Sequence, residues 1–89
     1  MAESDLQRKI IKAMRLSGWY VVKLVLTNKP GIPDLLCCKN KMAVWMEAKD
    51  AGKEAEPLQL LRHKELRDQG FEVYIIDTWE QFLTIKQNL

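Results

Sequence analysis

The fold is decided by the stretch Gly31-Ile32-Pro33-Asp34-Leu35-Leu36 and by Val44-Trp45-Met46-Glu47-Ala48-Lys49-Asp50, which follows it. Both stretches contain short apolar runs of the kind that form strands, and the polar segment Lys39-Asn40-Lys41 separates them. Together they predict a β-hairpin with strands at residues 34–38 and 42–49.

This hairpin would bring three charged side chains together. In an antiparallel pair the start of one strand lies beside the end of the next, so we expect Asp34 to lie level with Glu47. Glu47 and Lys49 are two residues apart and should therefore project from the same face of the strand.

The remaining segments alternate between helical and strand patterns. Ser4 and Gln7 fit a capping box at the start of the first helix, and Trp79, Phe82 and Leu83 are expected to face the core from the last helix. We predict helices at 4–17, at 57–69 and after Thr78, and strands at 19–26 and 71–77. The resulting order αβββαβα predicts an α/β fold with a mixed sheet and helices on both faces.

Length and composition set the broad class of protein. The 89 residues suit a single domain spanning 1–89, and 47% hydrophobic with 29% charged residues excludes a disordered chain. No apolar run approaches the ~20 residues that span a membrane, and the polar start of the chain does not fit a signal peptide, so we expect a cytoplasmic protein. Cys37 and Cys38 are adjacent and are expected to be reduced. A net charge of +2 permits nucleic-acid binding but does not indicate it.

The chemistry of the three hairpin residues is that of a metal-dependent phosphodiesterase. Two carboxylates a few ångströms apart repel each other unless a cation lies between them. Mg²⁺ prefers such oxygen ligands and keeps several waters, which leaves room for phosphate oxygens. Lys49 would hold the attacking water and stabilise developing negative charge.

A structural explanation competes with this one, because charged residues at hairpin ends most often form a solvated rim with weak salt bridges. Two features favour the functional interpretation. Gly31 and Pro33 fix the chain just before Asp34, and Glu47 and Lys49 end a strand that is otherwise apolar.

Taken together, the sequence resembles a PD-(D/E)xK nuclease, and more narrowly the short stand-alone VRR-NUC family of phages and bacteria. The motifs that carry the resemblance are Gly18-Trp19, Gly31-x-Pro33-Asp34-Leu35, Glu47-x-Lys49, Gln59 and Gly70. Nearly the whole chain is covered, and the combination is far more specific than a bare D…ExK pattern.

The resemblance implies a role for each matching residue. Asp34 and Glu47 would bind Mg²⁺, with Mn²⁺ able to substitute, and the Ala48 carbonyl would be a third ligand. Lys49 would be the catalytic lysine, and Gln59 would help to position the lysine or the phosphate. No other small-molecule cofactor is implied.

Further residues are predicted around this centre. Glu3 is the favoured acidic partner from the first helix, with Asp5 as its competitor, although a capping box at Ser4 would leave Glu3 just outside that helix. The expected phosphate contacts are Lys23, Asn28, Lys29 and Lys53, each of which has simple surface charge as its alternative. The only histidine, His63, follows Gln59 by one helical turn and is expected to be solvated.

The function that follows is a Mg²⁺-dependent, structure-selective DNA endonuclease. The chain is too small to carry a sequence-reading module, so branched DNA such as a four-way (Holliday) junction is the expected substrate. The resemblance implies a homodimer, for which Leu24, Leu26 and Trp79 could supply apolar contacts. A non-catalytic nucleic-acid-binding or assembly module predicts a broken set of catalytic residues. A subunit that relies on a partner for targeting is the third possibility. If encoded by a phage, the protein would act in the cytoplasm of the bacterial host.

Overall fold

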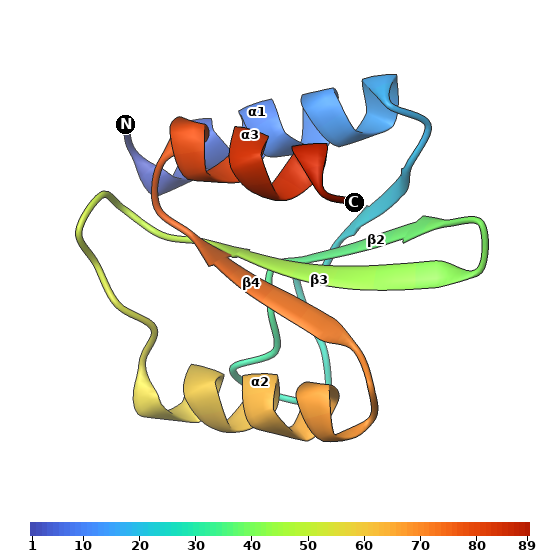
Figure 1. Cartoon of the computed structure of the whole chain (residues 1–89). Helices are drawn as coiled ribbons and strands as arrows, with labels where there is room; N and C mark the ends of the chain where they lie inside the picture. The colour runs from blue at the N-terminus through green and yellow to red at the C-terminus, as the bar shows by residue number, and fades with distance from the viewer.

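Three helices and four strands follow one another in the order that the sequence predicts (Figure 1). The computed structural model describes all 89 residues. Its elements are α1 (Glu3–Leu16), β1 (Tyr20–Lys23), β2 (Leu35–Lys39), β3 (Met42–Ala48), α2 (Pro57–Asp68), β4 (Glu72–Ile76) and α3 (Trp79–Gln87). The predicted αβββαβα fold is therefore confirmed.

The four strands form one mixed sheet in the order β1-β2-β3-β4. The β1–β2 and β2–β3 pairs are antiparallel, whereas β3 and β4 are parallel and connected through α2. Helices α1 and α3 lie side by side on one face of the sheet and α2 covers the other (Figure 1). None of the helices has the length and apolar character needed to cross a membrane.

The hairpin has the register that the sequence predicts. Leu35 pairs with Met46, so the next position places Asp34 level with Glu47. The turn is shorter than expected, because Lys39 pairs with Met42 and belongs to β2. Asn40 and Lys41 alone reverse the chain, with φ angles of 51° and 66° that match the tight two-residue turn of a twisted hairpin.

The two faces of β3 differ in character. Alternate residues Val44, Met46 and Ala48 belong to the main core beneath α1 and α3, whereas Glu47 points to the α2 side, where it meets residues of that helix. The core is completed by Leu6, Ile10, Met14, Trp19, Leu35, Cys37, Ile76 and Phe82. Each large aliphatic side chain buried there contributes about 1.5–3 kcal/mol, and so the face shared with α1 and α3 supplies most of the packing energy.

The start of α1 differs from the expectation in a way that affects the site. The helix begins at Glu3, not after Ser4, and Ala2 occupies the N-cap position with no side-chain cap, so the predicted capping box is wrong. A distant residue replaces it: the Glu3 N–H donates to Asp50 Oδ1 at 2.7 Å. This tertiary cap satisfies a helix-end donor and ties α1 to the chain just after β3.

Two other expectations for packing are wrong. The strand predicted at 19–26 ends at Lys23, and Val25 and Leu26 are 84% and 93% exposed. The last bond of this ladder is made by the Leu24 N–H to the Asp34 carbonyl, after which the chain has no strand to pair with. On α3, Leu83 is 46% exposed, and Ile85 packs against the core in its place.

Candidate functional site

The predicted catalytic residues meet where β2 begins and β3 ends. The Ala48 N–H donates to Asp34 Oδ2 at 3.0 Å, which fixes that carboxylate against the returning strand. Lys49 Nζ lies 3.8 Å from Glu47 Oε2, and its side chain is only 12% exposed. Helices α1 and α2 both begin at this end of the sheet (Figure 1). The hairpin therefore gathers Asp34, Glu47 and Lys49 as its register requires.

Glu47 is buried, not part of a solvated rim. The residue is 1% exposed beneath α2. Its Oε2 accepts a hydrogen bond from Gln59 Nε2 at 2.7 Å, and its Oε1 lies 3.5 Å from His63 Nε2. A solvated rim with weak ion pairs does not describe this carboxylate, because burying a charge is costly unless partners compensate for it.

The local electrostatics leave an excess of negative charge. Burial raises the pKa of Glu47 to about 7, and the Asp34 carboxylate beside it adds to this rise. Glu3 and Glu56 raise the Glu47 pKa further, and Lys49 is the only cation that opposes them. Burial also raises the pKa of Asp34, although the Ala48 N–H and the Gln7 amide counteract it. Such raised values occur where a site is built to hold a cation or a proton.

Gln59 makes two hydrogen bonds, one through the oxygen and one through the nitrogen of its side-chain amide. Its Oε1 accepts a hydrogen bond from the Glu56 N–H at 2.9 Å, which satisfies a free donor at the start of α2. Its Nε2 donates to Glu47, so the amide orientation is fixed from both sides. The first turn of α2 thus positions the glutamate, which makes Gln59 more than an ordinary polar helix residue.

A cleft of about 500 Å³ opens over Asp34 on the α1 side of the hairpin. Glu3 lines it, whereas Asp5 is paired with Arg8, so the geometry favours Glu3 as the acidic partner. The cleft is lined by Ala2, Glu3, Ser4, Gln7, Lys23, Leu24, Val25, Asp34 and Asp50. The sequence did not predict that Gln7 and Asp50 would lie at the site, although Asp50 directly follows the Glu47-x-Lys49 motif.

The carboxylates do not form a three-membered side-chain cluster. No group of three His, Cys, Asp or Glu side chains comes close enough to hold a metal ion. Glu3 lines the cleft with Asp34 on the α1 side, whereas Glu47 is hydrogen-bonded to Gln59 of α2. Asp34 and Glu47 are therefore the two carboxylates that the hairpin register brings level with each other.

The four predicted phosphate contacts are dispersed. Lys23 lines the cleft beside Asp34. Lys53 lines a separate hollow with Asp77, beyond the end of β4. Asn28 and Lys29 are exposed in the loop before β2, which is anchored where Arg62 Nε donates to the Pro30 carbonyl at 2.8 Å. Lys23 alone among them shares the cleft with a catalytic candidate.

His63 is the main residue that sequence reasoning misplaced. It was expected to be solvated, but it is 0% exposed and faces Glu47. Its spacing of one helical turn from Gln59 was the available signal, because residues at i and i+4 share a helix face. The residues next to His63 in the sequence are charged, and this is why the sequence predicted a solvated side chain.

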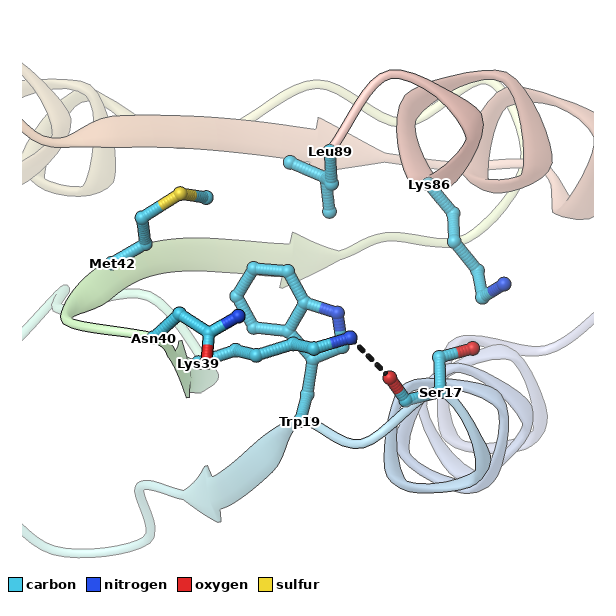
Figure 2. Close-up of a pocket in the computed structure, with 7 residues that line it drawn as sticks. All are labelled: Ser17, Trp19, Lys39, Asn40, Met42, Lys86 and Leu89. Atoms are coloured by element: carbon cyan, nitrogen blue, oxygen red, sulfur yellow. Dashed lines mark hydrogen bonds between the residues drawn. The ribbon is translucent and has the colours of Figure 1, made fainter.

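A second hollow, of about 340 Å³, lies at the opposite, turn end of the hairpin (Figure 2). Lys39 extends along the Trp19 ring, 5.9 Å from its centroid, and its Nζ donates to the Ser17 carbonyl at 2.7 Å. Gly18, with φ of 88°, turns the chain between them. The Gly18-Trp19 motif therefore joins α1 to the sheet and contributes no group to the carboxylate site.

Comparison with known proteins agrees with the fold described above. No family model matches the chain. A solved structure described as a VRR_NUC domain superposes with a TM-score of 0.86 and 25% identity, covering 96% of this chain and 94% of that one. The chain has the VRR-NUC fold. The VRR-NUC resemblance drawn from the sequence is thus confirmed.

A curated relative extends the comparison to a phage protein. "Putative nuclease p44" of Acyrthosiphon pisum secondary endosymbiont phage 1 is 27% identical over 77 residues, which are 85% of this chain and 83% of that protein. These similarities support a nuclease.

Proposed function

We propose that this protein is a Mg²⁺-dependent DNA endonuclease whose active site is the Asp34, Glu47 and Lys49 cluster. The observation that carries the proposal is the burial of Glu47 beside Asp34, with one lysine against several carboxylates. A fold that only had to be stable would not retain such a charge imbalance beneath a helix. A bound cation together with a phosphate group would resolve it.

The residues present fit a magnesium ion. Mg²⁺ is commonly bound through one or two carboxylates, and it keeps water or phosphate oxygen in its other positions. Asp34 and Glu47 provide such a pair, and the absence of a larger His or Cys cluster does not fit a structural zinc site. The Ala48 carbonyl as a further ligand, and Glu3 acting through water, are part of the proposal. When bound, the ion would lower the pKa of a water and neutralise charge on the scissile phosphate.

The roles of the protein groups follow from their positions. Asp34 and Glu47 hold the cation, and Gln59 keeps the Glu47 carboxylate in place through its 2.7 Å hydrogen bond. The Lys49 ammonium, partly shielded from water, orients the attacking water and stabilises the negative charge that develops on the phosphate.

A basic face on α1 supports a nucleic-acid substrate. Arg8, Lys12 and Arg15 recur at i, i+4 and i+7, so they share one exposed side of the helix, and Lys12 and Arg15 have no carboxylate partner. These cations span about 10 Å along the helix axis, a length comparable to a few base pairs of duplex. Because α1 starts at the cleft with Glu3, DNA following this face would lead into the site.

Branched DNA acted on by a homodimer is the favoured form of this activity. Val25 and Leu26 are strongly exposed apolar residues, and Leu24 and Val25 also line the cleft. A two-fold contact through this segment would cover apolar surface and place two clefts near each other, as a two-fold junction requires. Of the dimer candidates, Leu26 is free to make contacts, whereas Trp79 packs on Phe82 with ring centroids 5.0 Å apart.

The test compares cleavage of a synthetic four-way junction and a linear duplex in Mg²⁺ or Mn²⁺. Lys49→Ala should abolish cleavage, whereas the control Lys64→Ala should not, because Lys64 is exposed on α2 and paired with Asp68. Equal activity of wild type and Lys49→Ala would refute the site. Binding without cleavage by the wild type would favour a non-catalytic module. Preferential cutting of the linear duplex would refute junction selectivity, and a monomer in sedimentation at micromolar concentration would refute the dimer.

A further inference from the structure

The layer between β3 and α2 contains every buried side-chain nitrogen or oxygen that lacks a hydrogen-bond partner. These four atoms are Trp45 Nε1, Glu47 Oε1, His63 Nδ1 and His63 Nε2. Buried polar atoms are normally paired, so a concentration of unpaired ones beside a candidate catalytic carboxylate requires an explanation.

Two of these atoms face each other. His63 Nε2 lies 3.5 Å from Glu47 Oε1, and both side chains are essentially inaccessible to solvent. The other oxygen of the same carboxylate accepts its hydrogen bond from Gln59, one helical turn before His63 on α2. One face of α2 therefore presents a donor group to each oxygen of Glu47.

We propose that His63 is a positioning residue, which donates its Nε2–H to Glu47 Oε1 and, together with Gln59, fixes the carboxylate as a ligand for the catalytic cation. This inference rests on the proposed function, because it assigns a role within the same site. A small inward movement of either side chain would shorten 3.5 Å to an ordinary hydrogen-bond length.

The chemistry fixes which nitrogen carries the proton. Neutral imidazole has one N–H donor and one acceptor nitrogen, and a carboxylate can only accept. With Nε2 protonated, the pair satisfies Glu47 Oε1. With Nδ1 protonated, two buried acceptors would face each other. Groups that hold a metal ligand in this way typically raise metal affinity by about 10–100-fold.

The first measurement needs no metal and no DNA. His63 is the only histidine in the chain, so its imidazole signals in a proton–nitrogen NMR correlation are unambiguous. At about pH 8.5, where an ordinary histidine is neutral, the Nε2–H tautomer is expected. The Nδ1–H tautomer would overturn the proposal.

The second measurement is the affinity of the DNA-free protein for Mn²⁺, determined by titration calorimetry. His63→Leu keeps an apolar filler but removes the donor, and it should weaken Mn²⁺ binding by about 10–100-fold. His63→Gln retains a donor and should recover much of that affinity. Phe82→Leu, in the core on the other face of the sheet, controls for a general loss of stability and should bind Mn²⁺ like the wild type.

The outcomes separate this inference from the proposed function. Wild-type binding that is unchanged in His63→Leu would refute the positioning role and leave the nuclease proposal intact. Equal losses in His63→Leu and His63→Gln would mean that the donor is not what His63 supplies, which also refutes it. A wild type that neither binds Mn²⁺ nor cuts DNA would refute the proposed function and the metal-positioning role with it, whereas the tautomer would still report on the contact to Glu47.

Discussion

Replacing Glu47 by Gln should make the metal-free protein more stable, and the gain should grow with pH. The Glu47 pKa is about 7 in the folded protein, compared with an ordinary value of 4.5. The folded state therefore binds the proton more tightly than the unfolded state. Stability falls as pH rises from about 4.5 to 7, because the native protein must give up a proton that the unfolded chain has already lost.

The size of the effect follows from the two pKa values. Each pKa unit corresponds to 1.36 kcal/mol, so the ionised Glu47 costs the folded protein about 3 kcal/mol above pH 7 and almost nothing below pH 4.5. Glutamine has nearly the same shape, and its amide oxygen can still accept the hydrogen bond from Gln59. The variant should therefore match the wild type in acid and exceed it by up to about 3 kcal/mol near pH 8.

The assay measures the free energy of unfolding by denaturant titration, monitored by circular dichroism, at several pH values between about 4.5 and 8.5. A chelator is present to keep the protein free of metal. The difference between wild type and Glu47→Gln removes contributions from groups that lie far from Glu47. His63 faces Glu47, and its contribution has the opposite sign, because burial lowers the pKa of His63 and this makes stability rise with pH. Glu54→Gln, at an exposed loop position, is the matched control for loss of one negative charge. Parallel pH profiles for wild type and Glu47→Gln would refute the reasoning.

Three other changes test separate parts of the structure. Gly31→Ala should destabilise the protein by about 2–4 kcal/mol, as measured by unfolding in denaturant. The reason is that φ of Gly31 is 84° and that an added Cβ would lie 2.9 Å from the Leu58 Cγ. Gln59→Leu should weaken Mn²⁺ binding in calorimetry by about 10–100-fold, since it removes the 2.7 Å donor to Glu47. Replacing Lys12 and Arg15 together by Gln should lower the slope of log affinity for duplex DNA against log salt by about 2.

Two of these changes have a matched comparison. Gly52→Ala shares a positive φ of 78° but meets nothing within 4 Å, so it should cost only about 1 kcal/mol. If both glycine variants lose the same free energy of unfolding, the close contact of residue 31 with Leu58 of α2 is not the reason that glycine is needed there. Neutralising Lys41 and Lys64 removes the same two charges from the hairpin turn and α2, and an equal change in salt slope there would contradict a dedicated α1 surface.

Local sequence signals were sufficient for most elements of the fold. Thr78 caps α3 by accepting from the Gln81 N–H at 3.1 Å, as the spacing predicts, because a cap depends only on residues within one turn. The hairpin also follows from two short strands joined by a polar segment, so the meeting of Asp34 and Glu47 could be predicted to within one residue. The two-residue turn that pairs Leu35 with Met46 came from the structure. The start of α1 could not, since its cap comes from Asp50, which is 47 residues away.

By itself, then, the sequence determined the αβββαβα order, the hairpin and the residues that it brings together. Only the tertiary structure decided the environment of those residues. Glu47 lies at a strand end, yet α2 covers it and removes it from water, which raises its pKa to about 7. The same covering turns His63 inward against the carboxylate. Residue spacing fixes which groups share a face, but desolvation depends on what packs over that face from elsewhere in the chain.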